Sequence, residues 1–508
     1  MNFSEFILAH DGDDLGRLAL ARGRYAASLA DVSCGGAAGF DLALTTLEVR
    51  RKLRDKVPEW YAVPSLVYPL RVSGEQCSST ATARYKASVA LHAVLGGSCK
   101  NRGDFLDETS ILADSCRKRG VFLDETLRLA DLTGGLGVDS WAFAQVFDEV
   151  LYNEMRPELA AAAEHNFREL GLTNVRVRNF ALVPGSSAMP DSDRIAPLIP
   201  GSDPGSPEAS VSQILGDFRP DVLFLDPARR AADGRKVFRL EDCQPDVLQL
   251  LPELLNACSH VLLKLSPMAD ITLVCKQLGC VKAVHVVAAD GECKELLLLL
   301  ERGYDGTYAM TIVEDGAVME IPGQARDEGR GPGSVMEISG QAGNDIHGGG
   351  PISSARPIPV NRPFECMKGN IAGGGPGIKI EPLPKIGPGK FLFEPGKAMM
   401  KAGAFDVPGR YGLEKLGKHT HLYVGAKVPE ELRPFGKVFE ILEVVPLNNR
   451  TVKDIGKRYP KADVTARNIP LTSDQLRKKL GVADGGTVHI FGVHIDSLND
   501  NYLLACLK

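Results

Sequence analysis

The chain has 508 residues, of which 44% are hydrophobic and 24% charged, and its formal net charge is −5. This length corresponds to about three domains, and the composition excludes a wholly disordered or collagen-like protein. The longest uninterrupted apolar stretch, Tyr502–Leu507, is too short to cross a bilayer, and the N-terminus lacks the basic segment of a secretory signal. We therefore expect a globular cytoplasmic protein that has no membrane partner.

The cysteines give no indication of a metal centre. All eleven are scattered, and neither a CxxC pair nor a cysteine–histidine cluster with the spacing of a zinc site occurs. This pattern is typical of reduced, mostly buried thiols in a reducing compartment. The sequence therefore predicts no bound metal.

Charge is distributed unevenly along the chain. Residues 379–508 hold 21 Lys and Arg against 14 Asp and Glu, a net charge of +7, so the other 378 residues carry −12. Three consecutive cations, Arg477 to Lys479, belong to a helix-like pattern in this part. A basic module on an acidic body indicates an anionic partner, although a solvated lysine-rich surface would have the same composition.

Residues 1–100 form a predicted helical N-terminal arm. Apolar residues recur at spacings of three and four over Ile7–Ala21, Leu42–Val57 and Ala81–Leu95, and Ser79 or Thr80 would cap the last helix. After the arm, Phe105–Thr109 is repeated 17 residues later, which indicates a tandem duplication without an evident function.

A doubly wound α/β sheet is predicted from Leu127 to Leu300. Short apolar segments alternate with helical ones, as in parallel sheets with helices on both faces. Pro-, Gly- and Ser-rich segments at 184–210 and 321–378 are interpreted as insertions, the second as largely unstructured. The predicted strands are Leu127–Leu132, Glu149–Asn153, Val175–Val177, Val222–Leu225, Val261–Leu265, Val281–Val287 and Leu296–Leu300.

A glycine-rich loop follows the first predicted strand. Asp131–Gly137 reads Asp-Leu-Thr-Gly-Gly-Leu-Gly, and a helical pattern begins directly after it. Glycines let the backbone approach a ligand, and a helix N-terminus offers unpaired N–H groups. Glu154 ends the second strand, where an acid typically accepts hydrogen bonds from ribose hydroxyls. The loop and the acid together predict a site for a nucleoside cofactor.

Two classes of cofactor fit this layout. A dinucleotide site requires G-x-G-x-x-G directly after the strand, which Gly135-x-Gly137-x-x-Ser140 matches only loosely. An S-adenosylmethionine site has an acid first and clustered glycines next, as in Asp131 followed by Gly134, Gly135 and Gly137. We therefore favour S-adenosylmethionine over NAD, with a ligand-free glycine turn as a third alternative.

Polar residues also follow the later strands. Asn179 and Phe180 come after the third strand and would contact a base and its ring, unless they are an ordinary turn residue and a core residue. Asp226 and Pro227 follow the fourth strand. Because ligands of open α/β sheets bind outside the strand ends, Asp226 is expected to face the crevice, and Pro227 stiffens the turn.

Two basic residues complete the predicted catalytic group. Arg229 follows the Asp-Pro turn and offers fixed positive charge to a phosphate-bearing substrate, unless it is solvated. Lys264 ends the fifth strand among apolar residues, so its ammonium either faces the cleft or extends to solvent. We assign Asp226, Pro227, Arg229 and Lys264 to catalysis.

These motifs resemble those of class I S-adenosylmethionine-dependent methyltransferases. Asp131–Gly137 looks like their first motif, Glu154 like their second-strand acid, Asn179-Phe180 like their third motif and Asp226–Arg229 like their fourth. The resemblance implies the following cofactor-binding residues: Asp131, Thr133, Gly134, Gly135, Gly137, Glu154, Met155, Asn179 and Phe180.

A narrower resemblance is to a bacterial group of such enzymes with a ferredoxin-like segment and a C-terminal THUMP-like domain. Its basis is Glu75–Lys86 in the arm, and in the tail Lys401–Phe405, Tyr411–Leu413, His421–Tyr423, Arg467–Leu471 and Leu476–Leu480. THUMP domains bind RNA, so the resemblance implies an RNA substrate. The implied domains are an arm at 1–100, a methyltransferase domain at 101–304, a ferredoxin-like segment at 305–390 and a THUMP-like domain at 391–508.

The fourth motif departs from two family patterns. Enzymes that methylate exocyclic amino groups usually have a second proline and an aromatic residue where this chain has Ala228 and Arg229. Enzymes that methylate C5 of pyrimidines need a nucleophilic cysteine near a later strand end, and Lys264–Pro267 contains none. We therefore expect direct methyl transfer to nitrogen or oxygen. The alternatives are methylation of a protein or small molecule, and a non-catalytic RNA-binding protein.

Overall fold

The computed structural model describes residues 2–29, 33–34, 37–95, 126–185, 206–229, 240–324 and 386–508. The first copy of the duplication lies outside these ranges, as do most of the 184–210 insertion and nearly all of the 321–378 insert. Within the described ranges, no helix combines the length and the apolar character needed to cross a bilayer.

The N-terminal arm is mostly helical, as predicted, but its first helix is shorter than expected. The pattern over Ile7–Ala21 forms two helices because Asp14 starts a new one, its carboxylate accepting the N–H of Arg17 at 2.8 Å. The pattern did not predict α6. The helices are α1 (Phe3–His10), α2 (Leu15–Leu20), α3 (Arg22–Tyr25), α4 (Gly39–Leu53), α5 (Pro58–Tyr61), α6 (Arg71–Gln76) and α7 (Thr80–Leu95).

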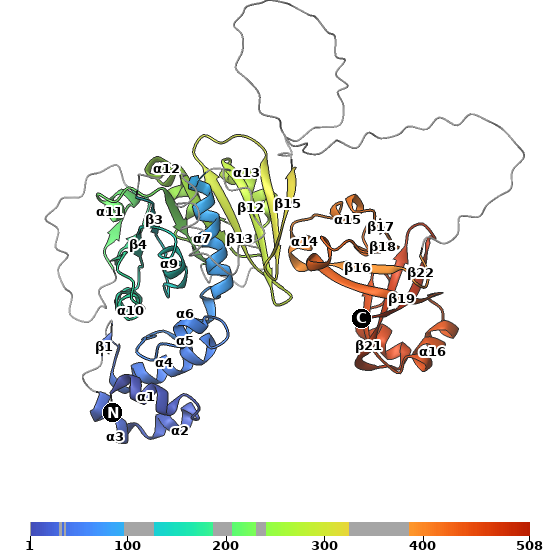
Figure 1. Cartoon of the computed structure of the whole chain (residues 1–508), viewed down its shortest axis with the longest axis horizontal. Coiled ribbons are helices and arrows are strands. Elements are labelled where there is room, and N and C mark those ends of the chain that lie inside the picture. The colour runs from blue at the N-terminus through green and yellow to red at the C-terminus, as the bar shows by residue number, and fades with distance from the viewer. Residues whose placement is uncertain are drawn as a thin grey trace, which may run out of the picture. The chain divides into compact units, whose positions relative to one another are not determined.

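The central element is a nine-stranded sheet, shown in Figure 1. Its order is β15-β14-β12-β13-β11-β8-β3-β4-β5, and all seven predicted strands are confirmed with small shifts at their ends. The strands are β3 (Arg128–Asp131), β4 (Glu149–Asn153), β5 (Val175–Arg178), β8 (Val222–Leu225), β11 (His260–Leu265), β12 (Val281–Ala289), β13 (Glu292–Glu301), β14 (Tyr308–Glu314) and β15 (Ala317–Gln324).

The sheet is doubly wound, because β4 and β8 pair in parallel with β3 on its two sides. Alternate residues of its strands enter two separate cores. Leu223 and Leu225 of β8 pack in one core with α11 (Val211–Leu215), α12 (Val247–Ala257) and α13 (Ile271–Leu278). Phe224 packs in the other core with α7, α9 (Val138–Phe143) and α10 (Pro157–Glu169). This alternation is the expected result of strands that are buried on both faces.

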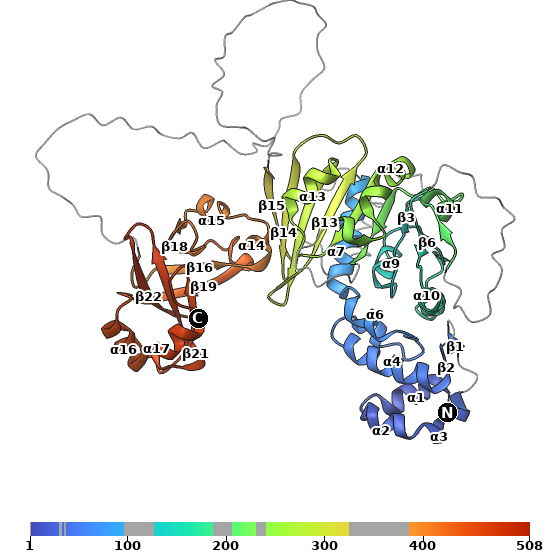
Figure 2. The ribbon, with the colours of Figure 1, turned by 180° about the vertical axis from the view of Figure 1, so that it is seen from behind.

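Strand β13 breaks the parallel pattern. It lies between β11 and β12 and runs antiparallel to both. Beyond β12, strand β14 pairs in parallel and β15 pairs antiparallel with β14, so residues 308–324 extend the large sheet. Figure 2 shows these strands side by side from behind. The sequence placed residues 305–324 in a separate ferredoxin-like segment, whereas their backbone hydrogen bonds belong to the central sheet.

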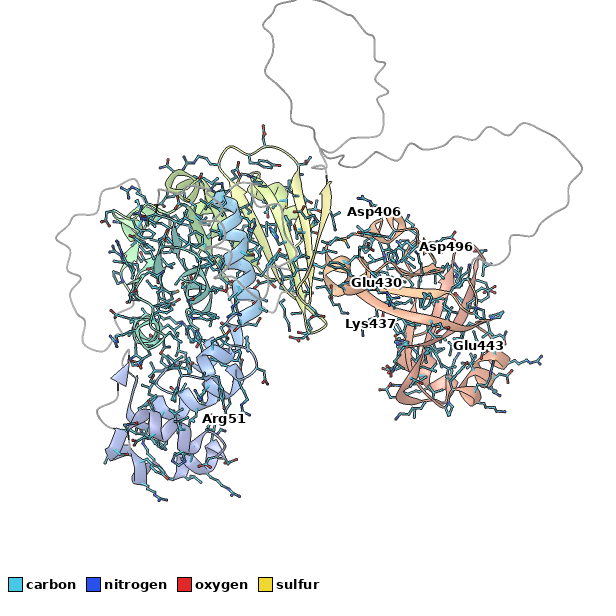
Figure 3. All side chains as sticks on the ribbon, in the orientation of Figure 1. Arg51, Asp406, Glu430, Lys437, Glu443 and Asp496 are labelled. Atoms are coloured by element: carbon cyan, nitrogen blue, oxygen red, sulfur yellow. The ribbon has the colours of Figure 1, made fainter. Side chains whose placement is uncertain are left out.

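The C-terminal residues form a second, seven-stranded sheet of order β17-β18-β16-β19-β22-β21-β20. Helices α16 (Asn449–Arg458) and α17 (Ser473–Leu480) cover it through a core that contains Ile455 and Leu476. Glu443, labelled in Figure 3, pairs with Arg458 and accepts the hydroxyl of Tyr459 at 2.8 Å. The strands are β16 (Phe391–Pro395), β17 (Glu414–Lys415), β18 (Tyr423–Gly425), β19 (Gly436–Pro446), β20 (Lys461–Arg467), β21 (Ala483–Ile495) and β22 (Asp500–Leu507).

Candidate cofactor and acceptor site

The glycine loop joins the end of β3 to the start of α9. Gly135 and Gly137 have φ angles of +54° and +96°, which favour glycine. A Cβ at Gly134 would lie 2.1 Å from the Tyr152 ring, and one at Gly137 would lie 2.8 Å from Phe167. A Cβ at Gly135 would meet no atom of the described residues within 4 Å. Gly134 and Gly137 are therefore required by packing, and Gly135 faces open space.

Asp131 is fully buried at the base of this loop. Its carboxylate accepts the N–H of Thr133 at 3.1 Å and the hydroxyl of Ser140 at 2.5 Å. Burial raises the pKa of Asp131 to about 8, although both hydrogen bonds act in the opposite direction. The side chain thus holds both ends of the loop, and burial makes it release its proton at a higher pH than an ordinary aspartate.

Glu154 is positioned against the middle of the loop. One carboxylate oxygen accepts the N–H of Gly135 at 2.8 Å, and the other accepts the N–H of Arg156 at 2.9 Å. Burial is the main reason why the pKa of Glu154 is raised, and the two N–H groups partly offset it. Each oxygen keeps a second lone pair, so the carboxylate has the capacity to accept ribose hydroxyls as well.

Asn179 and Phe180 lie next to the end of β4, but their bonds there are structural. The Asn179 amide donates to the carbonyl of Glu154 at 2.7 Å. Phe180 exchanges two hydrogen bonds with the side chain of Asn153, both at 3.1 Å. Met155 is 44% exposed beside Glu154. Sequence reasoning missed Asn153, whose amide also reaches the carbonyl of Leu132 at 3.1 Å and so ties three strand ends together.

The Asp-Pro turn after β8 is bonded to the glycine loop. The backbone N–H of Asp226 donates to the hydroxyl of Thr133 at 2.6 Å. Pro227 is buried, and the Asp226 side chain is 35% exposed. The backbone of Arg229 belongs to β9 (Ala228–Arg229), which pairs with β10 (Cys243–Gln244). The position of the Arg229 side chain lies outside the described part of the structure, so its assignment stays a prediction.

Lys264 faces this turn rather than solvent. Its Nζ lies 2.5 Å from the Asp226 carboxylate and 3.9 Å from that of Glu295 on β13. Burial lowers the pKa of Lys264, but the charges of Asp226 and Glu295 outweigh burial and raise it overall. The ammonium is therefore stably charged. Of the two interpretations of Lys264 that the sequence left open, the contact with Asp226 favours the cleft.

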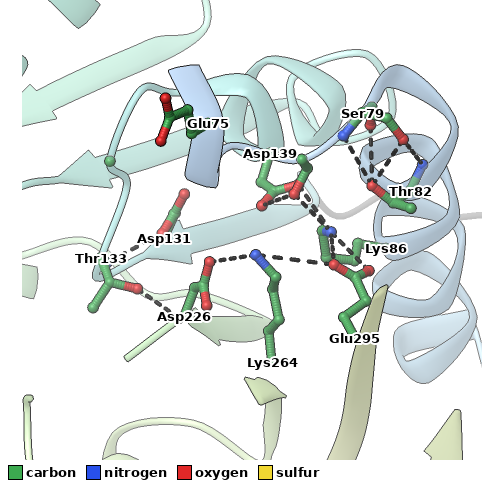
Figure 4. Close-up of polar contacts among 12 residues, drawn as sticks. Glu75, Ser79, Thr82, Lys86, Asp131, Thr133, Asp139, Asp226, Lys264 and Glu295 are labelled. Carbon is green, nitrogen blue, oxygen red and sulfur yellow. Dashed lines mark hydrogen bonds and ion pairs between the residues drawn. The ribbon is translucent and has the colours of Figure 1, made fainter. Parts of the chain in front are cut away.

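Sequence reasoning assigned no site role to four more charged or polar residues of this region, and Figure 4 shows three of them, Lys86, Asp139 and Glu295. Lys86 of α7 is fully buried and lies 2.8 Å from Glu295 and 3.3 Å from Asp139 of α9. The Ser78 hydroxyl donates to Asp139 at 2.9 Å. In the sequence, Glu295 stands out only because it directly precedes the five consecutive leucines 296–300. Lys86 had none by itself.

At this site a ligand can approach the backbone of the glycine loop at Gly135. The Glu154 carboxylate lies beside the loop, and Lys264 holds a second carboxylate, that of Asp226. Such a site can bind a nucleoside through the loop and Glu154, and can orient a polar acceptor through Asp226. It offers no nucleophilic cysteine among the described contacts: Cys77 carries a thiol whose pKa is raised by burial.

Family comparisons match the C-terminal part of the chain. Residues 391–432 match a ferredoxin-like domain, and residues 436–508 match a THUMP domain-like family. The first range covers β16 to β18 and the second covers β19 to β22, so both matches share one sheet. Both therefore differ from the predicted boundaries, which were 305–390 for the ferredoxin-like segment and 391–508 for the THUMP-like domain.

One solved structure matches the chain over its whole length. A crystal structure from Porphyromonas gingivalis W83, provisionally described as a methyltransferase, has 23% identity and a TM-score of 0.62, covering 100% of this chain and 97% of that one. The two chains therefore share one fold. No curated protein matches the sequence.

Two further solved structures match only part of the chain. A SAM dependent methyltransferase from Aquifex aeolicus has 14% identity, a TM-score of 0.22 and coverage of 37% of this chain and 89% of its own. The T. thermophilus 16S rRNA N2 G1207 methyltransferase has 12% identity, a TM-score of 0.23 and coverage of 41% and 45%. These scores are too low to support an argument. The comparisons thus show a fold shared with the P. gingivalis structure and, in the C-terminal sheet, matches to a ferredoxin-like domain and a THUMP domain-like family.

Proposed function

We propose that this protein is an S-adenosylmethionine-dependent methyltransferase that acts on RNA. The observation that carries the proposal is the hydrogen bond between Thr133 and Asp226, because it joins a loop suited to a nucleoside cofactor to a carboxylate suited to an acceptor. Methyl transfer requires these two binding functions side by side, since donor and acceptor must be aligned for direct displacement.

The residues of the loop fit the cofactor. Gly135 leaves open space above its Cα, and Glu154 keeps lone pairs for the ribose hydroxyls. Asp131, Thr133, Gly134 and Gly137 would fix the loop backbone, while Met155, Asn179 and Phe180 would border the base. When bound, S-adenosylmethionine supplies a methyl group that is already activated by its sulfonium.

The acceptor would be oriented by Asp226. Lys264 holds one oxygen of this carboxylate, and the other would accept a hydrogen bond from the nitrogen or oxygen that becomes methylated. Arg229 would hold a phosphate of the substrate, as expected of a guanidinium. Pro227 would keep the turn rigid. The protein then contributes alignment and exclusion of water, and no covalent intermediate with the enzyme is needed.

RNA is proposed as the substrate from the C-terminal module. Its net charge of +7 over residues 379–508 suits a polyanion, and THUMP domains are known from RNA-modifying enzymes. Lys453, Lys457, Lys478 and Lys479 are exposed on α16 and α17. Charge and shape would dominate this contact, because aromatic residues make up only 6% of the chain.

Three rival functions are separated by two measurements. Thermal stabilisation by S-adenosylhomocysteine but not by NAD would separate a methyltransferase from a nicotinamide-dependent oxidoreductase. Incubation with methyl-labelled S-adenosylmethionine and total bacterial RNA then tests the substrate. Label in RNA supports the proposal, and label only in protein or small molecules contradicts the RNA substrate. Binding of RNA and cofactor without any labelled product would indicate a non-catalytic protein.

A further inference from the structure

A continuous row of charged side chains connects the arm to the proposed acceptor site (Figure 4). It runs from Asp139 to Lys86 at 3.3 Å, from Lys86 to Glu295 at 2.8 Å, from Glu295 to Lys264 at 3.9 Å and from Lys264 to Asp226 at 2.5 Å. Opposite charges alternate along the whole row. Asp139 lies two residues after the glycine loop, so the row joins the cofactor side to the acceptor side.

The two central residues of this row, Lys86 and Glu295, are almost completely buried, which restricts the positions of their charged groups. Lys86 is 0% exposed and the Glu295 side chain is 4% exposed, so neither charge can be compensated by water. A buried charge is costly unless it is paired and hydrogen-bonded, and Lys86 meets this condition with both Glu295 oxygens, Asp139 and Ser78. Lys86 thereby holds both oxygens of Glu295, and one of these oxygens also lies 3.9 Å from the Nζ of Lys264.

The position of Lys264 is not fixed by its strand alone. A lysine has four rotatable side-chain bonds, and Asp226 is 35% exposed, so this pair by itself could adopt several geometries. Glu295 lies on the neighbouring antiparallel strand β13, where its backbone is paired with Val287 of β12. A fixed carboxylate beside the ammonium restricts where Nζ can lie, and so where the Asp226 carboxylate can lie.

We infer that Glu295 and Lys86 are positioning residues for the proposed methyl transfer, which makes α7 of the N-terminal arm an integral part of the active site. The inference rests on the proposed function. Lys86 holds Glu295, Glu295 holds Lys264, and Lys264 presents Asp226 to the acceptor. A merely structural ion pair would stabilise the fold but would leave the reactivity of Lys264 and the turnover unchanged.

The first test measures Lys264 directly and needs no substrate. The full-length protein is pulsed with an amine-acylating reagent under mildly alkaline conditions, and modification of Lys264 is quantified by mass spectrometry. The charges of Asp226 and Glu295 keep this amine protonated, so Glu295→Gln, which removes one of them, should increase its modification several-fold. Lys86→Met removes a neighbouring cation and keeps both carboxylates, so it should instead lower the modification of Lys264. Glu292→Gln on the same strand, whose side chain is 75% exposed, and Arg84→Met on α7 are the matched controls and should behave like the parent.

The second test measures transfer of labelled methyl groups to total bacterial RNA. Glu295→Gln should lower kcat by about tenfold or more while the KM for S-adenosylmethionine and the affinity for S-adenosylhomocysteine stay within about twofold of the parent. Lys86→Met leaves the charge of Glu295 without its partner. If this variant does not fold, the double variant Lys86→Met/Glu295→Gln, which removes both charges, is measured in its place. Circular dichroism and melting curves establish that each variant is folded.

The outcomes separate the two proposals. A folded Glu295→Gln variant with parental Lys264 modification and parental kcat overturns the positioning role. Increased Lys264 modification together with lowered kcat supports it. If the parent transfers no methyl group to any acceptor, the proposed function fails, and with it the positioning role in methyl transfer, whatever the reactivity of Lys264.

Discussion

Thr133 and Asp226, which are 93 residues apart, are joined by a 2.6 Å hydrogen bond from the Asp226 backbone N–H to the Thr133 hydroxyl. Thr133 in turn donates its own N–H to Asp131. These two bonds therefore link the glycine loop directly to the Asp-Pro turn. Because the bond to Asp226 uses its backbone, the carboxylate can be changed without breaking the link, which permits separate tests of cofactor binding and catalysis.

Gly135→Ala is expected to weaken S-adenosylhomocysteine binding by roughly tenfold or more, because the new methyl group would enter the open space that the cofactor would fill. Gly171→Ala is the matched control: Gly171 also has a positive φ and also faces open space, but it lies at the far end of α10. Calorimetry on both folded variants measures the effect. Equal affinities would remove Gly135 from the cofactor site.

Glu154→Ala should weaken cofactor binding by about 1.5–3 kcal/mol, the range for hydrogen bonds to a charged group. Glu154→Gln should recover part of this loss because its carbonyl oxygen can still accept one hydrogen bond. Glu164→Ala on the exposed face of α10 serves as the control in the same titrations. Parental affinity in both Glu154 variants would contradict a ribose contact at this position.

Asp226→Asn should lower methyl transfer by about 100-fold or more and leave cofactor affinity nearly unchanged, since the proposed partner of the carboxylate is the acceptor. Single-turnover assays and calorimetry on the same preparation measure the two effects. Asp217→Asn, at an exposed position of the same domain, should retain parental turnover. Near-parental activity of Asp226→Asn would move the acceptor role to another residue, with Lys264 next.

Asp131 should make the parent less stable at higher pH. Burial raises its pKa from an ordinary value of 3.8 to about 8, so the folded protein binds a proton there that the unfolded chain releases. The contribution to the free energy of unfolding is complete below about pH 4 and declines as the pH rises towards 8. Relative to Asp131→Asn, the parent should therefore lose stability across this interval. Urea unfolding of both proteins at several pH values measures the difference, and a constant difference would contradict the raised pKa.

Lys478 and Lys479 should contribute more to RNA binding than Arg477. The Arg477 guanidinium is engaged by Asp474 at 2.7 Å and Asp484 at 3.3 Å, whereas both lysines are exposed. Changing both lysines to Gln should weaken binding to bulk bacterial RNA and reduce the salt slope by about 0.7–0.9 per lost phosphate contact.

The control for this titration is Lys282→Gln/Lys294→Gln, which removes two cations from the central sheet. This variant should keep the parental salt slope, because it loses the same charge outside the C-terminal module. Identical slopes for the two double variants would show that Lys478 and Lys479 only solvate the surface of α17. S-adenosylhomocysteine affinity should be parental in both.

Local sequence determined the strands of the central sheet and the position of its glycine loop. The apolar segments that predict β3, β4, β5, β8, β11, β12 and β13 are short and bounded by turn residues, and they contribute buried residues to both faces of the sheet. The acids at Asp131 and Glu154 follow from the same pattern, because they end consecutive strands. The sequence did not indicate that β13 runs antiparallel to its neighbours, because a run of leucines has the same apolar pattern in either strand direction.

Tertiary structure decided the contacts between segments that are distant in the chain. Lys86 and Glu295 are 209 residues apart, and neither residue indicates by itself that it is buried opposite the other. Their pairing depends on where α7 packs against the sheet and on the antiparallel insertion of β13. The same holds for β14 and β15, whose apolar pattern fits either a separate domain or an extended sheet. Backbone hydrogen bonds to β12 select the extended sheet, because a strand edge is satisfied only by the neighbour that reaches it.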